Sequence, residues 1–265
     1  MSTEDLIKKV ELLSAQVEKL TIESEVRKLH HKYGYYMDKC LYKEVADLFA
    51  DHAETSVQFL NGIWRGLPGI KSLYIERFAK GFVGGRNGPV QGFLLDHLMA
   101  QDIVDYDAST GRVLMRARTF MSAGTHEGMP EGLQIPPERG SGGRGVCTRT
   151  SEYIRDSDGK WRILKLRYFP FWHGTFEHGW RYTKEQFVPF MTKKKGDEGA
   201  DANAPDELLE EAMLWPDTRV VPFHYPHPVT GRWTEEKDLR APVIGTDEME
   251  AKPALDLYRV FAEKS

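Results

Sequence analysis

The order of the predicted elements up to Trp172 constrains the fold of this chain more than any other feature of its sequence. Two helical stretches come first, and a short hairpin, a third helix and four long strands follow. This order predicts an α+β fold in which helices wrap a curved antiparallel sheet into a cone. A cone of this size leaves an internal pocket, in which ionisable side chains can move protons without a cofactor.

The first helical stretch opens with apolar residues at alternating spacings of four and three, which is a heptad pattern. These residues are Leu6, Val10, Leu13, Val17 and Leu20. Two interpretations are open, an amphipathic helix that packs on its own domain or a helix that pairs with another subunit. Apolar spacing then continues to Tyr36, and a second short helix is expected near 42–49.

Residues that favour strands fill 55–60 and 63–65, around the hairpin dipeptide Asn61-Gly62. A helical pattern over 70–82 follows Pro68. Polar turns then join two pairs of longer strands, which we expect over 93–106, 112–123, 145–155 and 160–172.

We therefore expect an N-terminal helix (1–21), a cone domain (22–174) and a loop-rich C-terminal extension (175–265). The extension is rich in aromatic residues and is expected to pack on the cone or on a neighbouring subunit. A Gly/Pro-rich insertion over 124–144 is predicted to cover the pocket mouth. Within the extension, 192–204 is predicted to be a mobile surface segment, and 207–213 a short helix.

The composition argues against several classes of function. A net charge of -4 provides no basic footprint for nucleic acid. No run of 18 apolar residues occurs, so no membrane span is expected. The N-terminus lacks an apolar signal core and the chain has only two cysteines, so a cytoplasmic location is expected.

Tyr33 and Asp38 are the first candidates for chemistry. Tyr33 lies on the apolar stripe of the helix and should face inward. Asp38 follows about 140° further round an ideal helix, so both share a cavity only if the helix ends near Asp38. Asp38 is either a base in the pocket or a residue that contacts local backbone and solvent.

His97 has the strand parity of Phe93 and Met99, so it should point to the face that these apolar residues cover. Such a histidine is either a core residue bonded to a neighbour or, with Asp38 and Tyr33, part of an acid–base set. On the last strand, Lys165 and Arg167 alternate with apolar residues. A cation there either holds a phenolate or other anionic oxygen, or forms a salt bridge at the sheet rim.

The histidines and cysteines show none of the spacings typical of zinc sites. We therefore predict no metal and no cofactor. The glycines of 84–92 do not follow a phosphate-binding register either.

The run from Lys32-Tyr33 to Asp38, the Leu48-Phe49 end of the second helix and Asp51-His52-Ala53 resemble the opening of SnoaL-like proteins. The Gly-x-Trp-x-Gly motif at 62–66, His97 and Trp161-Arg162-Ile163 are similar to the same family, over about 22–172. SnoaL-like proteins belong to the nuclear transport factor 2-like cone-fold superfamily. Members include dehydratases, a dehydrochlorinase, polyketide cyclases and formaldehyde-releasing lyases of lignin-derived diaryl propanes.

The resemblance implies catalytic roles for Tyr33, Asp38 and His97, and more loosely for Arg167. It favours a cofactor-independent lyase, a dehydratase or formaldehyde lyase, that acts on a phenolic aromatic small molecule. The long aromatic extension is similar to that of the lignin-fragment lyases. We expect a homo-oligomer, either a dimer or a trimer, and we expect the substrate to contact Tyr36, Phe59, Trp64, Phe93, Lys165, Trp172 and His173.

Two other classes of function are open, since one fold serves many functions. One is a non-catalytic module for binding or assembly. The other is the small subunit of an aromatic-ring dioxygenase, which would need a large iron-containing partner.

Overall fold

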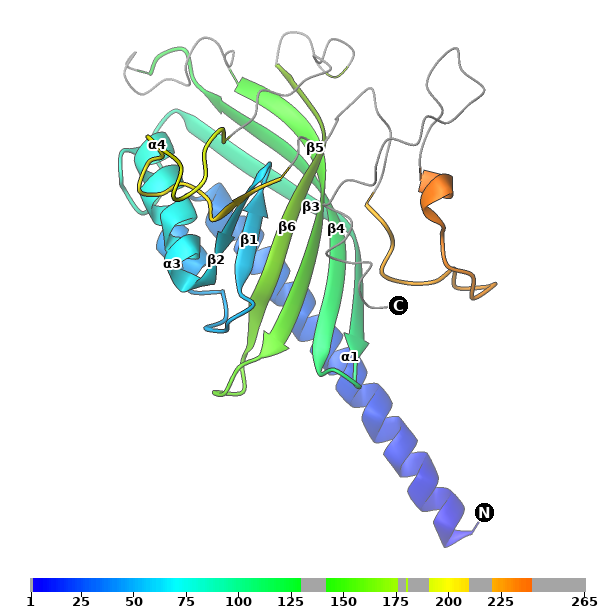
Figure 1. The fold of residues 1–265 in the computed structure, drawn as a ribbon. Coiled ribbons are helices and arrows are strands. Elements are labelled where there is room, and N and C mark those ends of the chain that lie inside the picture. The colour runs from blue at the N-terminus through cyan, green and yellow to red at the C-terminus, as the bar shows by residue number, and fades with distance from the viewer. Residues whose placement is uncertain (1, 130–141, 176–179, 181–190, 210–220, 240–265) are drawn as a thin grey trace, which may run out of the picture.

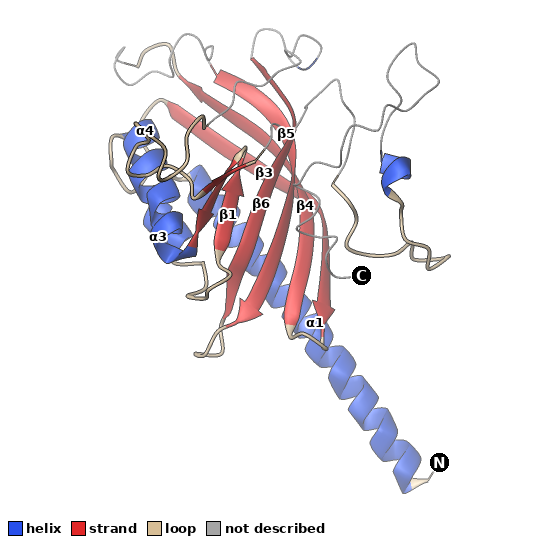
Figure 2. Cartoon of the chain, in the orientation of Figure 1, coloured by secondary structure: helices blue, strands red, loops and turns tan. Residues whose placement is uncertain are grey.

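The computed structural model describes residues 2–129, 142–175, 180, 191–209 and 221–239. A seven-stranded sheet forms its centre, in the order β3-β4-β5-β6-β1-β2-β7. All neighbouring pairs are antiparallel except β1 and β6, which are parallel. The sheet is curved and unclosed, and helices lie against it (Figures 1 and 2). The predicted α+β fold is confirmed.

Strands β1 to β6 lie close to their predicted positions, and β7 was not predicted. Their bounds are β1 Ser56–Phe59, β2 Gly62–Arg65, β3 Phe93–Asp107, β4 Arg112–Thr125, β5 Gly142–Arg155, β6 Trp161–Thr175 and β7 Glu207–Leu208. The turn of the first hairpin is Leu60-Asn61, one residue earlier than predicted, because Phe59 pairs with Gly62. Leu60 takes the positive φ of 52° that this turn needs.

The third predicted helix is one continuous coil with a π-helical centre. It consists of α3 Gly66–Lys71, the π-helix η1 Ser72–Ala79 and α4 Lys80–Val83. Gly84, in the left-handed conformation (φ 61°), ends it. A short 3₁₀ helix, η5, covers Glu236–Leu239 in the extension.

The first helix, α1 (Thr3–Asp38), is longer than any other helix described, and α2 (Tyr42–Ala46) follows it. Its C-terminal half packs on one face of the sheet, which we call the inner face. Figure 1 shows its N-terminal half extending beyond the sheet. None of the helices among the described residues has the length and apolar character that a membrane span requires.

The apolar stripe of this N-terminal half is not covered by the described part of its own chain. Leu6, Val10, Leu13, Val17 and Leu20 are between 48% and 66% exposed. The buried residues of α1 begin at Ile22 and continue through Val26 to Met37, on a face roughly 160° round the helix from the stripe. Packing on its own sheet, the first of the two interpretations, therefore does not account for the stripe.

Part of the C-terminal extension packs against the hairpin. The Asn61 side chain bonds the backbone of Met191, and the indole N–H of Trp64 donates to the Asn203 carbonyl at 3.0 Å. Glu207 pairs with Ile63 across β2 and β7. The predicted surface segment over 192–204 is largely exposed, and its predicted mobility stays a prediction. The helix predicted over 207–213 does not begin at 207, where β7 lies, and 210–213 lie outside the described residues. Most of the insertion predicted over 124–144 lies outside the described residues.

The opposite, outer face of the sheet carries a later part of the extension. The Arg116 guanidinium donates to the carbonyls of Val221 and Pro222 and lies 4.6 Å from the centroid of the Phe223 ring. His224 Nε2 lies 3.0 Å from Asp105 Oδ2. The extension therefore reaches β3 and β4 from the side that α1 does not cover.

Candidate active site

Asp38 and His97 meet at the end of α1. His97 Nδ1 lies 2.8 Å from Asp38 Oδ1, and the two side chains are 7% and 13% exposed. A carboxylate only accepts hydrogen bonds, so Nδ1 carries the hydrogen and Nε2 keeps its lone pair. Burial lowers the pKa of His97, and the positive charge of Arg149 lowers it further. The hydrogen bond to Asp38 raises it, but the net shift of the pKa is downward. The imidazole is therefore neutral near pH 7 and can act as a base.

The end of α1 places Asp38 beside the sheet. Lys39 leaves the helical conformation, and Cys40 takes a positive φ of 53° before α2 begins. The helix thus ends at Asp38, which is the condition for Tyr33 and Asp38 to share one face of the sheet. On β3, Phe93, Leu95 and Met99 are partly buried like His97, while the residues between them are exposed.

Tyr33 lies on the inner face, but it does not bond the Asp38–His97 pair. Its hydroxyl lies 3.0 Å from that of Tyr74, and its ring stacks on His30. Burial raises the pKa of Tyr33 above its usual value. The phenol therefore keeps its proton at neutral pH and can donate a hydrogen bond.

Arg149 is the inner-face residue that the sequence did not reveal. It is 2% exposed, and its Cζ lies 5.2 Å from the ring centroid of Tyr33 and 5.9 Å from that of Tyr168. Its position on the inner face follows from its pairing with Tyr168 across β5 and β6. Strand alternation groups Arg149 with Cys147 and Tyr153, but only the pairing shows which face this group occupies.

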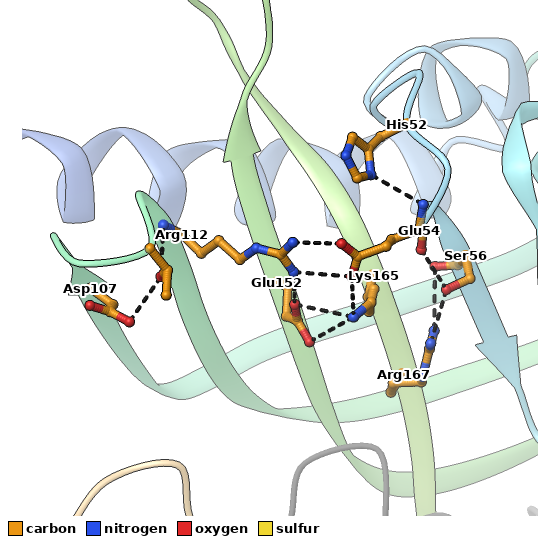
Figure 3. Close-up of polar contacts among 9 residues, drawn as sticks. His52, Glu54, Ser56, Asp107, Arg112, Glu152, Lys165 and Arg167 are labelled. Carbon is orange, nitrogen blue, oxygen red and sulfur yellow. Dashed lines mark hydrogen bonds and ion pairs between the residues drawn. The ribbon is translucent and has the colours of Figure 1, made fainter. Parts of the chain in front are cut away.

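Arg167 and Lys165 lie on the outer face, so their assignment to the site is wrong. Arg167 donates to Ser56 Oγ at 2.9 Å, and burial lowers its pKa to about 10. Lys165 lies 2.9 Å from Glu54 Oε2 in an ionic cluster that also contains Arg112 (Figure 3).

A bulge explains this change of face. Ile163 pairs with Tyr153 on the inner side, whereas Lys165 pairs with Glu152 on the outer side, so Leu164 is the extra residue. One extra residue moves every later side chain to the opposite face.

One of the predicted substrate contacts, Trp172, also lies away from the site. A second bulge separates the pairs Val146–Trp172 and Cys147–Pro170. It places the Trp172 ring 6.5 Å from that of Phe120, on the outer face, so this contact is wrong. Trp64 pairs with Val57, whose partner on β6 is Leu166 of the inner face, so Trp64 lies on the inner side of the sheet. It is fully buried there and bonds Asn203 of the extension, and its contact with substrate stays a prediction.

Four other predicted contacts lie on or next to the inner face. Phe59 packs on Tyr168 at 5.2 Å between ring centroids, and Phe93 stacks on Phe82 at 5.9 Å. His173 Nε2 lies 3.0 Å from the Tyr168 hydroxyl, and burial lowers the pKa of His173 to about 4. Tyr36 is partly buried against the core. The inner face is therefore aromatic around its few polar groups.

In the part of the chain that the structure describes, no three His, Cys, Asp or Glu side chains cluster as metal ligands would. The prediction of a site without metal stays a prediction.

Several solved structures are similar to part of this chain, and those named here are distant in sequence. One is a protein of Novosphingobium aromaticivorans whose assignment as a scytalone dehydratase is provisional (14% identity, 59% of this chain and 89% of that chain, TM-score 0.44). Another is a type 2 hexachlorocyclohexane dehydrochlorinase (16%, 58% and 88%, TM-score 0.44). A third is a nuclear transport factor 2-like protein of Salmonella enterica (16%, 57% and 91%, TM-score 0.42).

No protein of curated function matches the sequence. Residues 18–167, which contain α1 from its middle onward and the sheet up to β6, match the family described as the SnoaL-like domain. This match covers more than half of the chain, so the protein belongs to the SnoaL-like family.

Proposed function

We propose that this protein is a cofactor-independent lyase that uses acid–base catalysis on a hydrophobic aromatic small molecule. The observation that carries the proposal is the hydrogen bond between Asp38 and His97 on the inner face. An imidazole held by a carboxylate in one tautomer, with its second nitrogen free, is a general base near neutral pH.

The substrate that fits this chemistry carries a phenol and, para to it, a carbon with a hydroxyl group. Loss of the phenolic proton and of the hydroxyl, which takes up a proton and leaves as water, gives a quinone methide. His97 then removes a proton. Removal from carbon gives an alkene, which is dehydration; removal from a primary hydroxyl releases formaldehyde and restores the phenolate. Both outcomes are redox-neutral, so neither requires an electron carrier.

Tyr33 takes the part of the hydrogen-bond donor in this scheme. Its raised pKa keeps the phenol protonated, and its hydroxyl already bonds Tyr74. Because Tyr33 does not bond His97, we assign it to orienting the leaving hydroxyl. The rings of Phe59, Phe93 and Tyr168 give the guest an aromatic surface.

The aromatic extension supports the comparison with formaldehyde-releasing lyases of diaryl propanes. Where the structure describes the extension, residues 191–208 pack on the hairpin and 221–224 reach the outer face. Formaldehyde is therefore the first product to measure.

We also propose that the protein is a dimer held by the stripe of α1. Valine at the first and leucine at the fourth position of each heptad favour a parallel coiled coil of two helices. Val10 and Val17 take the first position, and Leu6, Leu13 and Leu20 the fourth. The flanking positions carry Ile7, Lys9, Ser14, Gln16 and Thr21, so no like charges oppose each other. A second copy of this chain is therefore the partner that the stripe fits.

Turnover by the purified protein tests the proposed activity. The protein is incubated with hydroxylated mono- and diaryl compounds without additives, and formaldehyde and the new conjugated absorbance are measured. We expect turnover that Asp38→Asn and His97→Ala strongly reduce, while the affinity for the ligand persists. His224→Ala is the matched control, since it breaks another His–Asp pair on the outer face.

Other outcomes assign other functions. Binding without turnover in all variants indicates a binding module. Turnover only with a co-purified iron-containing subunit indicates the dioxygenase alternative, and turnover only with added metal or nicotinamide contradicts a cofactor-independent lyase.

A further inference from the structure

Three arginines are buried among the described residues, and Arg149 differs from the other two in its partners. Arg116 donates to the carbonyls of Val221 and Pro222. Arg167 donates to oxygen atoms of Ser56 and Leu166. Both guanidinium groups therefore have oxygen acceptors of the kind that stabilise a buried cation.

Arg149 has softer partners. Its Nη1 lies 3.4 Å from Met99 Sδ, and its Cζ lies near the ring faces of Tyr33 and Tyr168. Its Nε is buried without a hydrogen-bond partner, as is that of Arg167, but among the described residues no oxygen atom accepts a hydrogen bond from the guanidinium of Arg149. The Cys147 thiol is a further neighbour. A sulfur atom and two π-faces compensate a buried guanidinium less well than an anion does.

The groups that face Arg149 do not supply that anion at neutral pH. Tyr33 from α1, Tyr74 from η1, Cys147 from β5 and Tyr168 from β6 surround it. Burial raises the pKa of each of these phenols and of the thiol, so all four stay neutral. The Asp38 carboxylate bonds His97 instead.

We propose that Arg149 binds an anionic oxygen carried by the aromatic ring of the guest, either a phenolate or a ring carboxylate. The assignment rests on the proposed function and names the substrate class for the same inner face. Guanidinium groups favour such oxygens because their N–H donors lie in one plane. Two of these donors can bond the two oxygens of a carboxylate or a single phenolate oxygen.

Met99 is the side chain that must move when the oxygen arrives. Its sulfur contacts Arg149, and its terminal methyl group lies against Gly34 of α1, 2.8 Å from where a Cβ would stand. Methionine has three rotatable bonds and can change rotamer without displacing the strand. The guest oxygen then takes the place of the sulfur.

This location fits the chemistry at His97. A phenolate held by Arg149 provides the electron pair that expels the benzylic hydroxyl. The same positive charge lowers the pKa of His97, which keeps the imidazole neutral. One cation would thus hold the substrate in its reactive ionisation state and keep the base unprotonated.

The test measures the ionisation of a bound probe and requires no turnover. 4-Nitrophenol changes its visible absorbance when it loses its proton, so a pH titration reports the pKa of the bound phenol. We expect the wild-type protein to lower that pKa by about one unit or more, which is a tenfold shift in the ionisation constant. Arg149→Gln should remove the shift and Arg149→Lys should keep part of it.

Matched variants separate this proposal from the proposed activity. Arg167→Gln removes a buried arginine on the outer face and should leave the shift unchanged. Asp38→Asn should keep the shift and lose turnover. If the shift is present but no compound is turned over, the binding site stands and the lyase function fails.

A second arm distinguishes the two sources of the oxygen. Competition for the protein by 4-nitrobenzoate and by neutral 4-nitrobenzyl alcohol compares a carboxylate with an uncharged guest. Preference for the phenolate probe alone identifies a phenol site, and preference for both anions a general oxyanion site.

Two results would overturn the proposal. One is a folded Arg149→Gln protein, checked by circular dichroism, that shifts the probe as the wild-type protein does. The other, which requires no variant, is a wild-type protein that neither lowers the pKa of 4-nitrophenol nor prefers 4-nitrobenzoate to the alcohol.

Discussion

His97 and Asp38 lie 59 positions apart in the sequence, and their side chains meet at 2.8 Å where α1 ends beside β3. Among the contacts described, neither side chain has a second hydrogen-bond partner. The pair lies on the face that also holds Arg149, Tyr33 and Tyr168. The pair should therefore affect turnover and its pH dependence, whereas the ionic cluster on the outer face should affect stability alone.

Asp38→Asn should reduce kcat by about 10²- to 10⁴-fold, which is the usual contribution of a positioned acid–base group. The asparagine keeps the shape of the side chain but can turn its amide N–H₂ toward Nδ1. His97 would then carry its proton on Nε2 and lose the lone pair that acts as the base. Steady-state kinetics on a compound that the wild-type protein converts measures the loss.

The melting temperature of this variant should stay within a few degrees of that of the wild-type protein, because the replacement leaves no cavity. An equal loss of kcat in His224→Ala would contradict the assignment, since His224 bonds Asp105 on the outer face.

The activity should persist below the pH at which a free histidine becomes protonated. Burial lowers the pKa of His97; the hydrogen bond to Asp38 opposes this shift, and Arg149 adds to it, while Asp96 acts in the opposite direction. A base works in its neutral form, so kcat/KM should fall with acid only below about pH 6.5. A pH–rate profile measures the midpoint.

Arg149→Gln removes one positive charge from the surroundings of His97 and should move this midpoint to higher pH. A profile whose acid limb stays in place in Arg149→Gln would show that the titrating group is not close to Arg149.

Much of this architecture could be predicted from the sequence, because alternation and turn chemistry are local signals. The four long strands, the hairpin and the end of the helix near Asp38 were all expected, and the parity of His97 placed it correctly. The face of Lys165 and Arg167 was wrong because a single extra residue, Leu164, reverses the alternation within β6. A second extra residue, Phe171, restores it, so Trp172 lies on the face opposite to Ile163, as unbroken alternation would also place it. No local pattern predicts such a bulge.

Arg149 could not be assigned from the sequence for a related reason. The inner face of β5 is defined by its partners on β4 and β6, which are non-local pairings. The extension shows the same limit, since the polar run over 192–204 is typical of a mobile loop. Its contacts with the hairpin depend on acceptors such as the Asn203 carbonyl, whose donor is Trp64, and this pairing is not a local signal.

The stripe of α1 predicts a dimer that a single charge should dissociate. Leu13→Glu places a carboxylate in the centre of the paired helices and should convert the dimer to a monomer in sedimentation equilibrium. Leu12→Glu is the matched control, because Leu12 is also exposed but lies off the stripe. Equal masses for both variants and the wild-type protein would contradict the pairing.

The outer-face cluster around Glu54 should contribute to stability in a way that depends on pH, and not to turnover. Hydrogen bonds from Arg112 and Lys165 lower the pKa of Glu54 to about 2. A carboxyl group with a lowered pKa stabilises the folded state above its unfolded pKa, near 4.3, and this contribution is lost as the pH falls toward 2.

Because Glu54 is partly exposed, Glu54→Gln should cost about 1 kcal/mol or less at pH 7. Denaturant unfolding at pH 7 and pH 2.5 measures the difference in the free energy of unfolding between the variant and the wild-type protein, and this difference should be smaller at the lower pH. The kcat of the variant at pH 7 should equal that of the wild-type protein. A large loss of kcat would mean that the outer face takes part in catalysis, in conflict with the assignment of the site to the face that holds His97.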